Sequence, residues 1–429
     1  MAAGTIRTVK ARQVLDSKGR PVVEADVVTE GGQLGRAGAS TGSSVGANES
    51  FVLRDNDPKL FGGLSVYKAV ENIEKVIAPA LVGLDVTDQA KIDRTMIELD
   101  GTRYKTKLGG NAIFAVSVAA SRAAAEVRNI PLYRMFASGD ITQVFAPASN
   151  VVNGGSYGDT TLAFQEFMVI PYNVKTFAEG TRIVVEVFQR LGEVIRKTNG
   201  RSANMGNYSG YGAPSDDPEV VFQMLTETVS QLGYTDNVVY AMDCASSEFY
   251  DAREKAYRYR GKLVSRDDII NVLAGLAERY PIAFIEDALE EEDFEGFKLA
   301  AEKIRTVIIG DDFLCTSLDR AKKAVEMGAA KGMIFKPNQA GTMTESMDTA
   351  RYILDNGLLL VPSGRAGGVL DSPDKEMGIG LGCLLSKLGA PRSGSRTMSF
   401  NFTLRLAEEL NLPMADIKKQ PCFSHIRFA

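Results

Sequence analysis

The second half of the chain repeats one pattern: a short apolar segment that ends on a polar residue, followed by an amphipathic segment with helical spacing. Nearly continuous apolar segments of this kind are typical of parallel strands covered on both faces by helices. Five segments end on such a polar residue. The first of these residues precedes the second by 43 positions, and the last four are separated by 25, 25 and 27 positions. Regular strand–helix units predict a (β/α)8-type barrel whose active site lies at the carboxyl ends of the strands. The polar ends are Asp243, Glu286, Asp311, Lys336 and Ser363.

The first part of the chain has a different pattern, which predicts a mixed α+β unit. Two segments alternate like antiparallel strands joined by a turn, and two later segments have the spacing of helices. The expected strands are 6–12 and 22–29, the turn is 17–21, and the expected helices are 66–81 and 111–128.

A Gly/Ser-rich stretch over residues 35–48 lies inside this unit rather than between two units. Segments with a more ordered sequence pattern follow this stretch, which favours a mobile lid over a flexible linker. We therefore expect an N-terminal α+β domain over residues 1–140, with the lid at GASTG (38–42), and an α/β barrel over residues 141–429.

Composition excludes several classes of function. The net charge of −5 leaves no basic footprint, so we expect no nucleic-acid partner. No apolar run is long enough for a signal peptide or a membrane span. The four cysteines form no C-x-x-C pair, which argues against a zinc cluster and is consistent with the cytoplasm. Since His425 is the only histidine, mechanisms that need a histidine base or ligand are nearly excluded.

Three carboxylates end consecutive strands of the expected barrel: Asp243, Glu286 and Asp311. Carboxylates that converge at a barrel mouth repel one another unless a cation neutralises them, and an all-oxygen set of ligands suits Mg²⁺. Each of these residues could instead cap the helix after its strand. Three in succession, followed by a lysine on the next strand, favour the metal site.

That lysine is Lys336, and a lysine near other cations can act as a general base because its pKa is lowered. A salt bridge to one of the carboxylates is the alternative. Arg365 and Lys387 add two cations on later barrel segments, which would suit an anionic substrate such as a phosphorylated carboxylic acid. Taken alone, either could be an ordinary surface charge.

Ten motifs occur in order along nearly the whole chain. They are ARQVLDSKGRPVVEADV (11–27), GASTG (38–42), KLGGNAIFAVSVAASRAAA (107–125), VVNGGS (151–156), QEFMVIP (165–171), MDCASSEF (242–249), IEDALEEED (285–293), GDDF (310–313), KPNQAGTMTES (336–346) and KLGAP (387–391). Together they resemble the enolase family. This resemblance implies an N-terminal α+β domain and an atypical α/β barrel, with a base and Mg²⁺ that stabilise an enolate.

The resemblance also implies roles for individual residues. Asp243, Glu286 and Asp311 would hold a first Mg²⁺, and Ser40 would help to hold a second. Lys336 matches the base that removes the proton α to the carboxylate. Lys387 and Arg365 match residues that bind the carboxylate side and the phosphate of the substrate. Matching positions at the rim of the pocket are Gln165 and Glu166, and we expect a catalytic role for Glu166.

The chain departs from the family pattern at several of these positions. The glutamate that serves as general acid is replaced by Tyr208 or by Ser209, depending on where one extra residue sits, or by no residue. The pocket histidine of N-G-G-S-H becomes Tyr157. In the motif S-H-R-S-G-E, Ser363 is kept, the histidine becomes Gly364 and the second serine becomes Ala366. The substrate contacts expected here therefore include Tyr157, Ser363 and Gly364, and Tyr208 is the expected proton donor.

Three functions are compatible with this pattern. The first keeps Mg²⁺ and Lys336 but changes the substrate or the outcome, as in enolase-like enzymes of phosphonate natural-product pathways that make carboxyphosphonoenolpyruvate. The second is an ordinary glycolytic enolase, which converts 2-phosphoglycerate to phosphoenolpyruvate, with a substituted acid. The third is a weakly catalytic binding or structural paralogue, which the retained Lys336 and metal ligands disfavour. We expect the first, with two Mg²⁺ per site, a cytoplasmic location and a homodimer or octamer, as is the family's habit.

Overall fold

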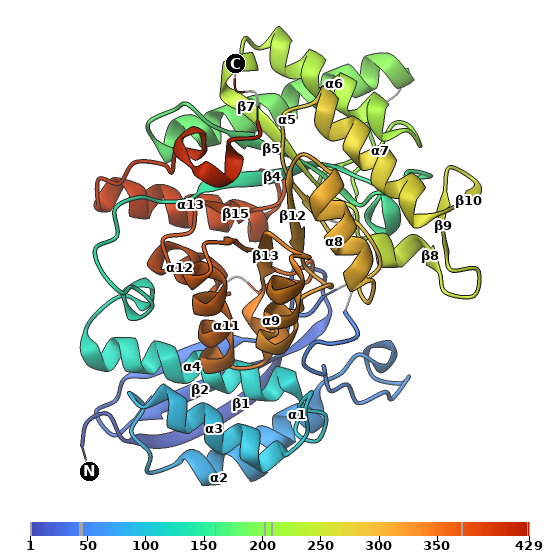
Figure 1. The fold of residues 1–429 in the computed structure, drawn as a ribbon. Helices are drawn as coiled ribbons and strands as arrows, with labels where there is room; N and C mark the ends of the chain where they lie inside the picture. Colours follow the sequence, from blue (N-terminus) through green and yellow to red (C-terminus); the bar gives the residue numbers. More distant parts are fainter. Residues whose placement is uncertain are drawn as a thin grey trace.

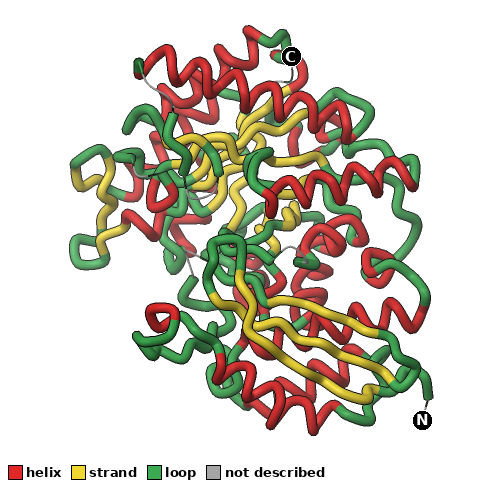
Figure 2. Tube along the Cα trace, turned by 180° about the vertical axis from the view of Figure 1, so that it is seen from behind, coloured by secondary structure: helices red, strands yellow, loops and turns green. Residues whose placement is uncertain are grey.

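The computed structural model describes residues 2–42, 46–158, 160–200, 203–206, 209–369, 372–426 and 428. A three-stranded antiparallel sheet and the helices packed on it lie below the barrel in Figure 1. The strands of that sheet run side by side in Figure 2 and pair in chain order. They are β1 (Ile6–Leu15), β2 (Pro21–Thr29) and β3 (Leu34–Gly38).

The turn between β1 and β2 is organised by Asp16. Its Oδ1 accepts hydrogen bonds from the backbone N–H groups of Lys18 (2.8 Å) and Arg20 (2.9 Å), and its Oδ2 accepts one from Nε of Arg20 (2.9 Å). The two strands and the turn expected from the sequence are thus confirmed. The prediction that residues 35–48 form a loop is partly wrong. The first of these residues belong to β3, in which alternate side chains pack into the core.

The helices of this part lie on one face of the sheet. The helix α4 (Gly110–Arg128) is Ala-rich and buried on nearly all sides, because it lies between the sheet and the helices α3 (Gln89–Asp100) and α11 (Met343–Asp355). Both expected helices are confirmed, although the first is divided by a π-helical turn at Ile73–Ile77. The helices are α1 (Tyr67–Asn72), α2 (Ala78–Leu81), α3 (Gln89–Asp100) and α4 (Gly110–Arg128).

Gly35 allows β3 to approach α4 closely. A Cβ at this position would lie 1.9 Å from the carbonyl oxygen of Ala119 and 2.5 Å from the backbone nitrogen of Ala123. Since both neighbours are helix backbone, neither can rotate away as a flexible side chain would.

The barrel sheet follows the order β14–β13–β12–β11–β7–β5–β4–β15 in the described residues. Only β5 runs against its neighbours. A parallel bridge between Ser363 and Lys387 joins the two ends of this path, so the sheet closes. This confirms the expected barrel. Its strands are β4 (Ala146–Asn153), β5 (Glu166–Pro171), β7 (Val238–Asp243), β11 (Ile282–Glu286), β12 (Val307–Gly310), β13 (Gly332–Phe335), β14 (Leu359–Pro362) and β15 (Leu385–Lys387).

Helices surround these strands, and their starts carry strong local signals. Thr176 and Ser265 each form a capping box with the acidic residue three positions later. The helices are α5 (Phe177–Asn199), α6 (Pro218–Gln231), α7 (Arg266–Arg279), α8 (Phe294–Lys303), α9 (Leu318–Met327), α10 (Pro337–Ala340), α11 (Met343–Asp355), α12 (Asp374–Gly380) and α13 (Gly394–Glu409).

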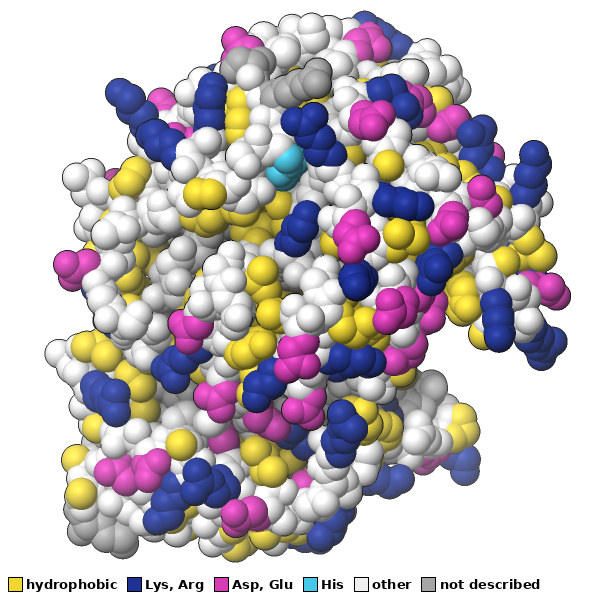
Figure 3. Space-filling view, viewed as in Figure 1, with side chains coloured by type: hydrophobic (Ala, Val, Ile, Leu, Met, Phe, Trp, Pro, Cys, Tyr) yellow, Lys and Arg dark blue, Asp and Glu magenta, His cyan; other side chains and the backbone are white. Residues whose placement is uncertain are grey.

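The remaining strands are short. β6 (Tyr211–Gly212) pairs with β4, and β8 (Tyr250–Asp251), β9 (Ala256–Tyr259) and β10 (Lys262–Val264) form a small antiparallel sheet beside the barrel (Figure 1). This sheet accounts for the longer first gap in the repeat. Charges of both signs are interspersed over the face in Figure 3. Among the described residues, no helix combines the length and the apolar character that crossing a bilayer requires.

We predict that Gly35→Ala destabilises the protein by about 1–3 kcal/mol, because the new methyl group forces β3 away from α4. The urea midpoint of unfolding, followed by circular dichroism, measures this change. Gly139→Ala is the matched control, since a Cβ there meets no atom within 4 Å. Equal midpoints for the two variants would contradict the proposed close approach.

Candidate active site

Three carboxylates meet at the rim of the barrel, one on each of the neighbouring strands β5, β7 and β11. Glu166 pairs in register with Asp243, and Asp243 pairs in register with Glu286. Each offers an oxygen that lies within 4.8 Å of the others, and all three side chains are buried. Glu166 starts its strand while the other two end theirs, and the reversed direction of β5 brings it to the same rim.

Lys387, on the closing strand β15, places its ammonium group among these three carboxylates. Its Nζ lies 2.6 Å from Glu166 Oε2, 2.6 Å from Glu286 Oε2 and 3.3 Å from Asp243 Oδ2. Burial alone would lower the pKa of Lys387, but the surrounding carboxylates outweigh it and hold the pKa well above its usual value. Burial raises the pKa of Asp243 to about 6 and also raises that of Glu286.

The donor set of this cluster fits a hard divalent cation. Within the described part of the chain, Oε1 of Glu166 and Oε1 of Glu286 are buried and have no hydrogen-bond partner. A buried carboxylate oxygen without a partner is costly unless it meets a proton donor or a cation. Carboxylate oxygens are the ligands that Mg²⁺ prefers, so these residues suit that ion.

Asp311 and Lys336 form a second part of the site. Oδ2 of Asp311 is ion-paired with Nζ of Lys336, and its Oδ1 accepts a hydrogen bond from Gln339 (3.1 Å). Burial would raise the pKa of Asp311, but Lys336 outweighs this effect and lowers it. The salt bridge considered for Lys336 from the sequence is therefore present. Asp311 also belongs to a second group of carboxylates, with Asp287 and Asp312, whose oxygens lie within 4.8 Å of one another. The expected role of Asp311 as a metal ligand beside Asp243 and Glu286 stays a prediction, as does the role of Glu166.

Asp287 is a buried acid that the sequence reasoning missed. Its carboxylate accepts the backbone N–H groups of Asp311 and Asp312, both at 2.8 Å, and so shapes the loop that carries Asp311. Burial raises its pKa to about 8, and the negative charges of Asp311 and Asp243 add to this. The only signal for it was its place directly after Glu286 in the motif IEDALEEED.

Arg365 is buried against Glu49, another residue that the sequence reasoning missed. Nη2 of Arg365 donates to Glu49 Oε1 at 3.0 Å, and Nη1 contacts the other carboxylate oxygen. Burial lowers the pKa of Arg365, yet the carboxylate of Glu49 outweighs it and keeps the guanidinium charged. Ser40, just before the described end of the lid, accepts a hydrogen bond through Oγ from the backbone N–H of Val369 (3.2 Å). The lid, through Ser40, and the segment after it, through Glu49, thus both contact the loop that follows β14.

The other expected contact residues surround the same rim. Gln165 donates to Glu248 Oε1 at 3.0 Å, which adds Glu248 to the site. Tyr157 packs against Ala366, close to Ser363 in the chain. Gly364 faces Arg396, and Tyr208 lies outside the described residues.

Comparison with known proteins explains this arrangement. Residues 6–136 match the family model "Enolase, N-terminal domain", and residues 142–416 match "Enolase, C-terminal TIM barrel domain". The chain belongs to the enolase family. It is 42% identical over 409 residues to a protein named Enolase from Methanococcus maripaludis strain S2, covering 95% of this chain and 96% of the relative. It is also 42% identical to an Enolase of Methanopyrus kandleri (94% and 96% covered) and 40% identical to one of Methanosarcina barkeri (94% and 95% covered).

Family and site together place this chain among the metal-dependent carbon–oxygen lyases. The buried cluster of Glu166, Asp243 and Glu286 is typical of the site at which such enzymes bind Mg²⁺. The altered positions 157, 208, 364 and 366 lie in a chain whose similarity to enolases extends over nearly its whole length.

We predict that Mg²⁺ stabilises the protein through this cluster. At about 100 times its Kd, the ion is expected to raise the free energy of unfolding by about 2.7 kcal/mol, and Glu286→Gln to remove most of that gain. Thermal unfolding with and without Mg²⁺ measures the effect, with Glu254→Gln, on an exposed turn, as control. Glu166→Gln discriminates further, because a ligand role weakens Mg²⁺ binding whereas a role in proton transfer alone leaves it unchanged. An identical Mg²⁺ effect in Glu286→Gln and Glu254→Gln would rule out the cluster as the metal site.

Proposed function

We propose that this protein is a Mg²⁺-dependent lyase that removes the α-proton of 2-phosphoglycerate, or of a close phosphorylated analogue, and forms phosphoenolpyruvate or a derivative. The observation that carries the proposal is the convergence at one barrel rim of three buried carboxylates with Lys387 and of Lys336 with Asp311. The lysines in this arrangement can bind a carboxylate, and a divalent cation held by the acids would stabilise the charge that develops on it. Names of the relatives and the family support the same chemistry.

Lys336 is the proposed base. Its Nζ is held by Asp311, and an ammonium group cannot accept a proton. Lys336 therefore becomes a base only when Asp311 no longer stabilises its charged form. Mg²⁺, when bound by the acidic cluster, would supply the positive field that makes the α-proton of a carboxylate acidic enough to remove.

Arg365 and Lys387 are the proposed substrate-binding cations. Both are engaged by carboxylates, Arg365 by Glu49 and Lys387 by the acidic cluster. An anionic substrate therefore replaces or joins these internal partners when it binds. The planar guanidinium of Arg365 suits a phosphoryl group, which it can contact through two nitrogens. Ser363, Gln165 and Tyr157 complete the proposed contacts.

This chain differs from the family pattern at the residue that would protonate the leaving β-hydroxide. Hydroxide is a poor leaving group, and a tyrosine with a pKa of about 10 is poorly matched as an acid near neutral pH. Tyr208 or Ser209 is the proposed replacement. Loss of a matched acid costs roughly 10²–10⁴-fold in rate.

Two variants of the function remain, an ordinary enolase and an enzyme with an altered substrate. Nearly full-length similarity to proteins named Enolase favours the first. Space beside Gly364 favours the second, since a Cβ there would meet no atom closer than 3.6 Å. Neither the relatives' names nor the described site supports a phosphonate-pathway reaction in particular. Turnover of 2-phosphoglycerate at tens per second, followed by phosphoenolpyruvate absorbance, would establish the ordinary enolase.

Several expectations accompany this proposal. We retain the division into domains at 1–140 and 141–429, two Mg²⁺ per site with Ser40 at the second, and a homodimer or octamer. A cytoplasmic location agrees with four cysteines that are all free thiols.

We predict that Lys336→Ala abolishes exchange of the α-hydrogen of the substrate. In D₂O with Mg²⁺ and 2-phosphoglycerate, the rate of deuterium incorporation is expected to fall by at least about 10²–10⁴-fold, the usual contribution of a general base. Proton NMR of the substrate measures the rate, and thermal stabilisation by Mg²⁺ is expected to persist. Lys298→Ala, an exposed lysine on α8, is the control. Undiminished exchange in Lys336→Ala would exclude Lys336 as the base.

A further inference from the structure

Lys336 belongs to a closed ring of hydrogen bonds that begins and ends on that residue. Its backbone N–H donates to Oγ1 of Thr316 at 3.0 Å. Oγ1 of Thr316 donates in turn to Oε1 of Gln339 at 2.9 Å, and Nε2 of Gln339 donates to Oδ1 of Asp311 at 3.1 Å. The other carboxylate oxygen of Asp311 is ion-paired with Nζ of Lys336, which closes the ring.

The two residues that complete this ring are shielded from water. Thr316 is 0% exposed and Gln339 is 2% exposed, and Asp311 is buried as well. A buried polar group that loses its partner meets no water in exchange, so each broken hydrogen bond is costly. A break at any point would leave groups without partners on both sides of it. The ring is therefore held together as a unit.

The hydrogen bonds of the ring can run in one direction only. The backbone N–H of Lys336 donates, so Oγ1 of Thr316 accepts there and has its single proton left for Gln339. The carboxylate of Asp311 accepts, so the amide of Gln339 turns its nitrogen toward Asp311 and its oxygen toward Thr316. This fixed amide orientation leaves Oδ2 of Asp311 to Nζ of Lys336.

Thr316 reaches Lys336 through a turn with a strained backbone. The carbonyl oxygen of Asp311 accepts the N–H groups of Leu314 (3.1 Å) and Cys315 (2.7 Å), so the loop after β12 turns back on itself. Cys315 and Thr316 each have a φ of 48°, in the left-handed region that β-branched residues such as threonine rarely adopt. Such strain persists where surrounding contacts fix it, and it is concentrated at functional sites. Here it places Oγ1 of Thr316 opposite the N–H of Lys336.

The neighbouring strand does not extend far enough to hold the backbone of Lys336. β12 ends at Gly310, which pairs with Met333 in β13. Pro337 starts α10 and disfavours a helical conformation at the residue before it, so Lys336 stays extended, with φ −124° and ψ 93°. The hydroxyl of Thr316 therefore accepts the N–H that a strand carbonyl would otherwise accept.

The backbone of Gln339 is held from the N-terminal part of the chain. Its carbonyl oxygen accepts the N–H of Ser50 at 2.8 Å. Oγ of Ser50 donates to the carbonyl oxygen of Ala340 at 2.9 Å. The position of Gln339 thus does not depend on the short helix α10 alone, and its side chain has a fixed base from which to reach Asp311.

We propose that Thr316 and Gln339 are positioning residues for Lys336. Thr316 fixes the backbone of the proposed base, and Gln339 fixes the carboxylate of Asp311 that holds its Nζ. The ring thereby sets where Nζ lies relative to the substrate, although neither Thr316 nor Gln339 touches the substrate. This inference rests on the proposed function, because it concerns the base of that reaction.

The first test compares Thr316→Val with Thr316→Ser. Valine has the shape of threonine but can neither accept from Lys336 nor donate to Gln339. We expect exchange of the α-hydrogen of 2-phosphoglycerate in D₂O, with the Mg²⁺-loaded enzyme, to slow about 10- to 100-fold in Thr316→Val. Serine keeps the hydroxyl and is expected to restore most of the rate. Proton NMR measures the rates, and equal rates in the two variants would overturn the inference.

Thr228→Val is the matched control for this comparison. Thr228 is buried in α6, and its hydroxyl donates to the carbonyl oxygen of Met224 at 2.7 Å. The variant therefore also removes a buried hydroxyl that makes a hydrogen bond, but outside the ring, and the exchange rate is expected to stay unchanged. Thermal unfolding shows that each variant is folded. An exchange rate that falls as far in Thr228→Val as in Thr316→Val would overturn a specific role of Thr316.

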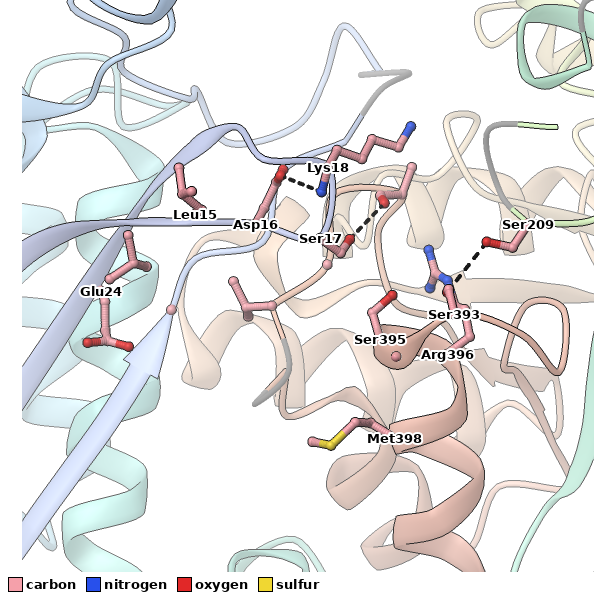
Figure 4. Close-up of a pocket in the computed structure, with 16 residues that line it drawn as sticks. Leu15, Asp16, Ser17, Lys18, Glu24, Ser209, Ser393, Ser395, Arg396 and Met398 are labelled. Atoms are coloured by element: carbon pink, nitrogen blue, oxygen red, sulfur yellow. Dashed lines mark hydrogen bonds between the residues drawn. The ribbon is translucent and has the colours of Figure 1, made fainter. Parts of the chain in front are cut away.

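Thr316→Gly separates the hydroxyl from the backbone turn. Glycine adopts a positive φ without strain but has no hydroxyl, so the exchange rate is expected to fall as it does in Thr316→Val. Ser393→Gly is the control, since Ser393 also has a positive φ (68°) and its Oγ lies 3.4 Å from Oγ of Ser209 at the edge of another cavity (Figure 4). Undiminished exchange in Thr316→Gly would show that the turn alone positions Lys336 and would overturn the ring.

Gln339→Leu tests whether the ring acts as a unit. The single variant is expected to slow exchange, because the carboxylate of Asp311 loses the amide that orients it. The double variant Thr316→Val/Gln339→Leu is expected to be no slower than the slower single variant, since either change breaks the same ring. Fully multiplicative losses in the double variant would overturn the inference.

A measurement without turnover separates this inference from the proposed function. If the unaltered enzyme does not exchange the α-hydrogen of 2-phosphoglycerate, the proposed function fails, and deuterium uptake at the backbone amide of Lys336 decides the ring alone. Mass spectrometry is expected to show uptake about tenfold faster in Thr316→Val than in Thr316→Ser, the effect of losing one hydrogen bond. Equal uptake in the two variants would overturn the ring. If the unaltered enzyme exchanges the α-hydrogen but Thr316→Val exchanges it equally fast, the ring is refuted and the proposed function stands.

Discussion

The ion pairs around Lys387 are the interaction on which the rest of the site depends. Three carboxylates are buried at one rim, and burying such charges without compensation is very costly. Lys387 comes from the strand that closes the barrel, so closure of the sheet and neutralisation of the acids occur together. Its charge compensates the same carboxylates that would hold a divalent cation. Breaking this arrangement by removing one partner leaves an uncompensated buried charge.

An ion pair and a hydrogen bond hold the loop that carries Arg365. Arg365 is joined to Glu49, from the segment after the lid, and Arg396 to the backbone of Arg365. The loop after β14 is therefore held from the N-terminal side and from α13 at once. Gly364 lies in that loop, and a Cβ there would meet no atom closer than 3.6 Å, so a change at this position leaves these supports in place.

Much of the fold could be predicted from the sequence because its signals are local. Regular apolar segments with polar ends predicted the barrel, and alternation predicted β1 and β2. These signals did not predict that β5 runs antiparallel to its neighbours. The position of Glu166 beside Asp243 was missed for this reason, because it depends on the direction of β5. Glu49 and Asp287 were missed for the same reason: each acts on a partner that is distant in sequence or on another loop.

By itself, the sequence determined which chemical groups stand at the ends of the strands, and that histidine is not among them. Periodicity and motif spacing are enough for this, since they depend on neighbours along the chain. Only the tertiary structure decided which carboxylates converge and that Lys387 lies among them. These relations depend on strand order, strand direction and barrel closure, because groups on different strands and loops become neighbours only when the sheet closes.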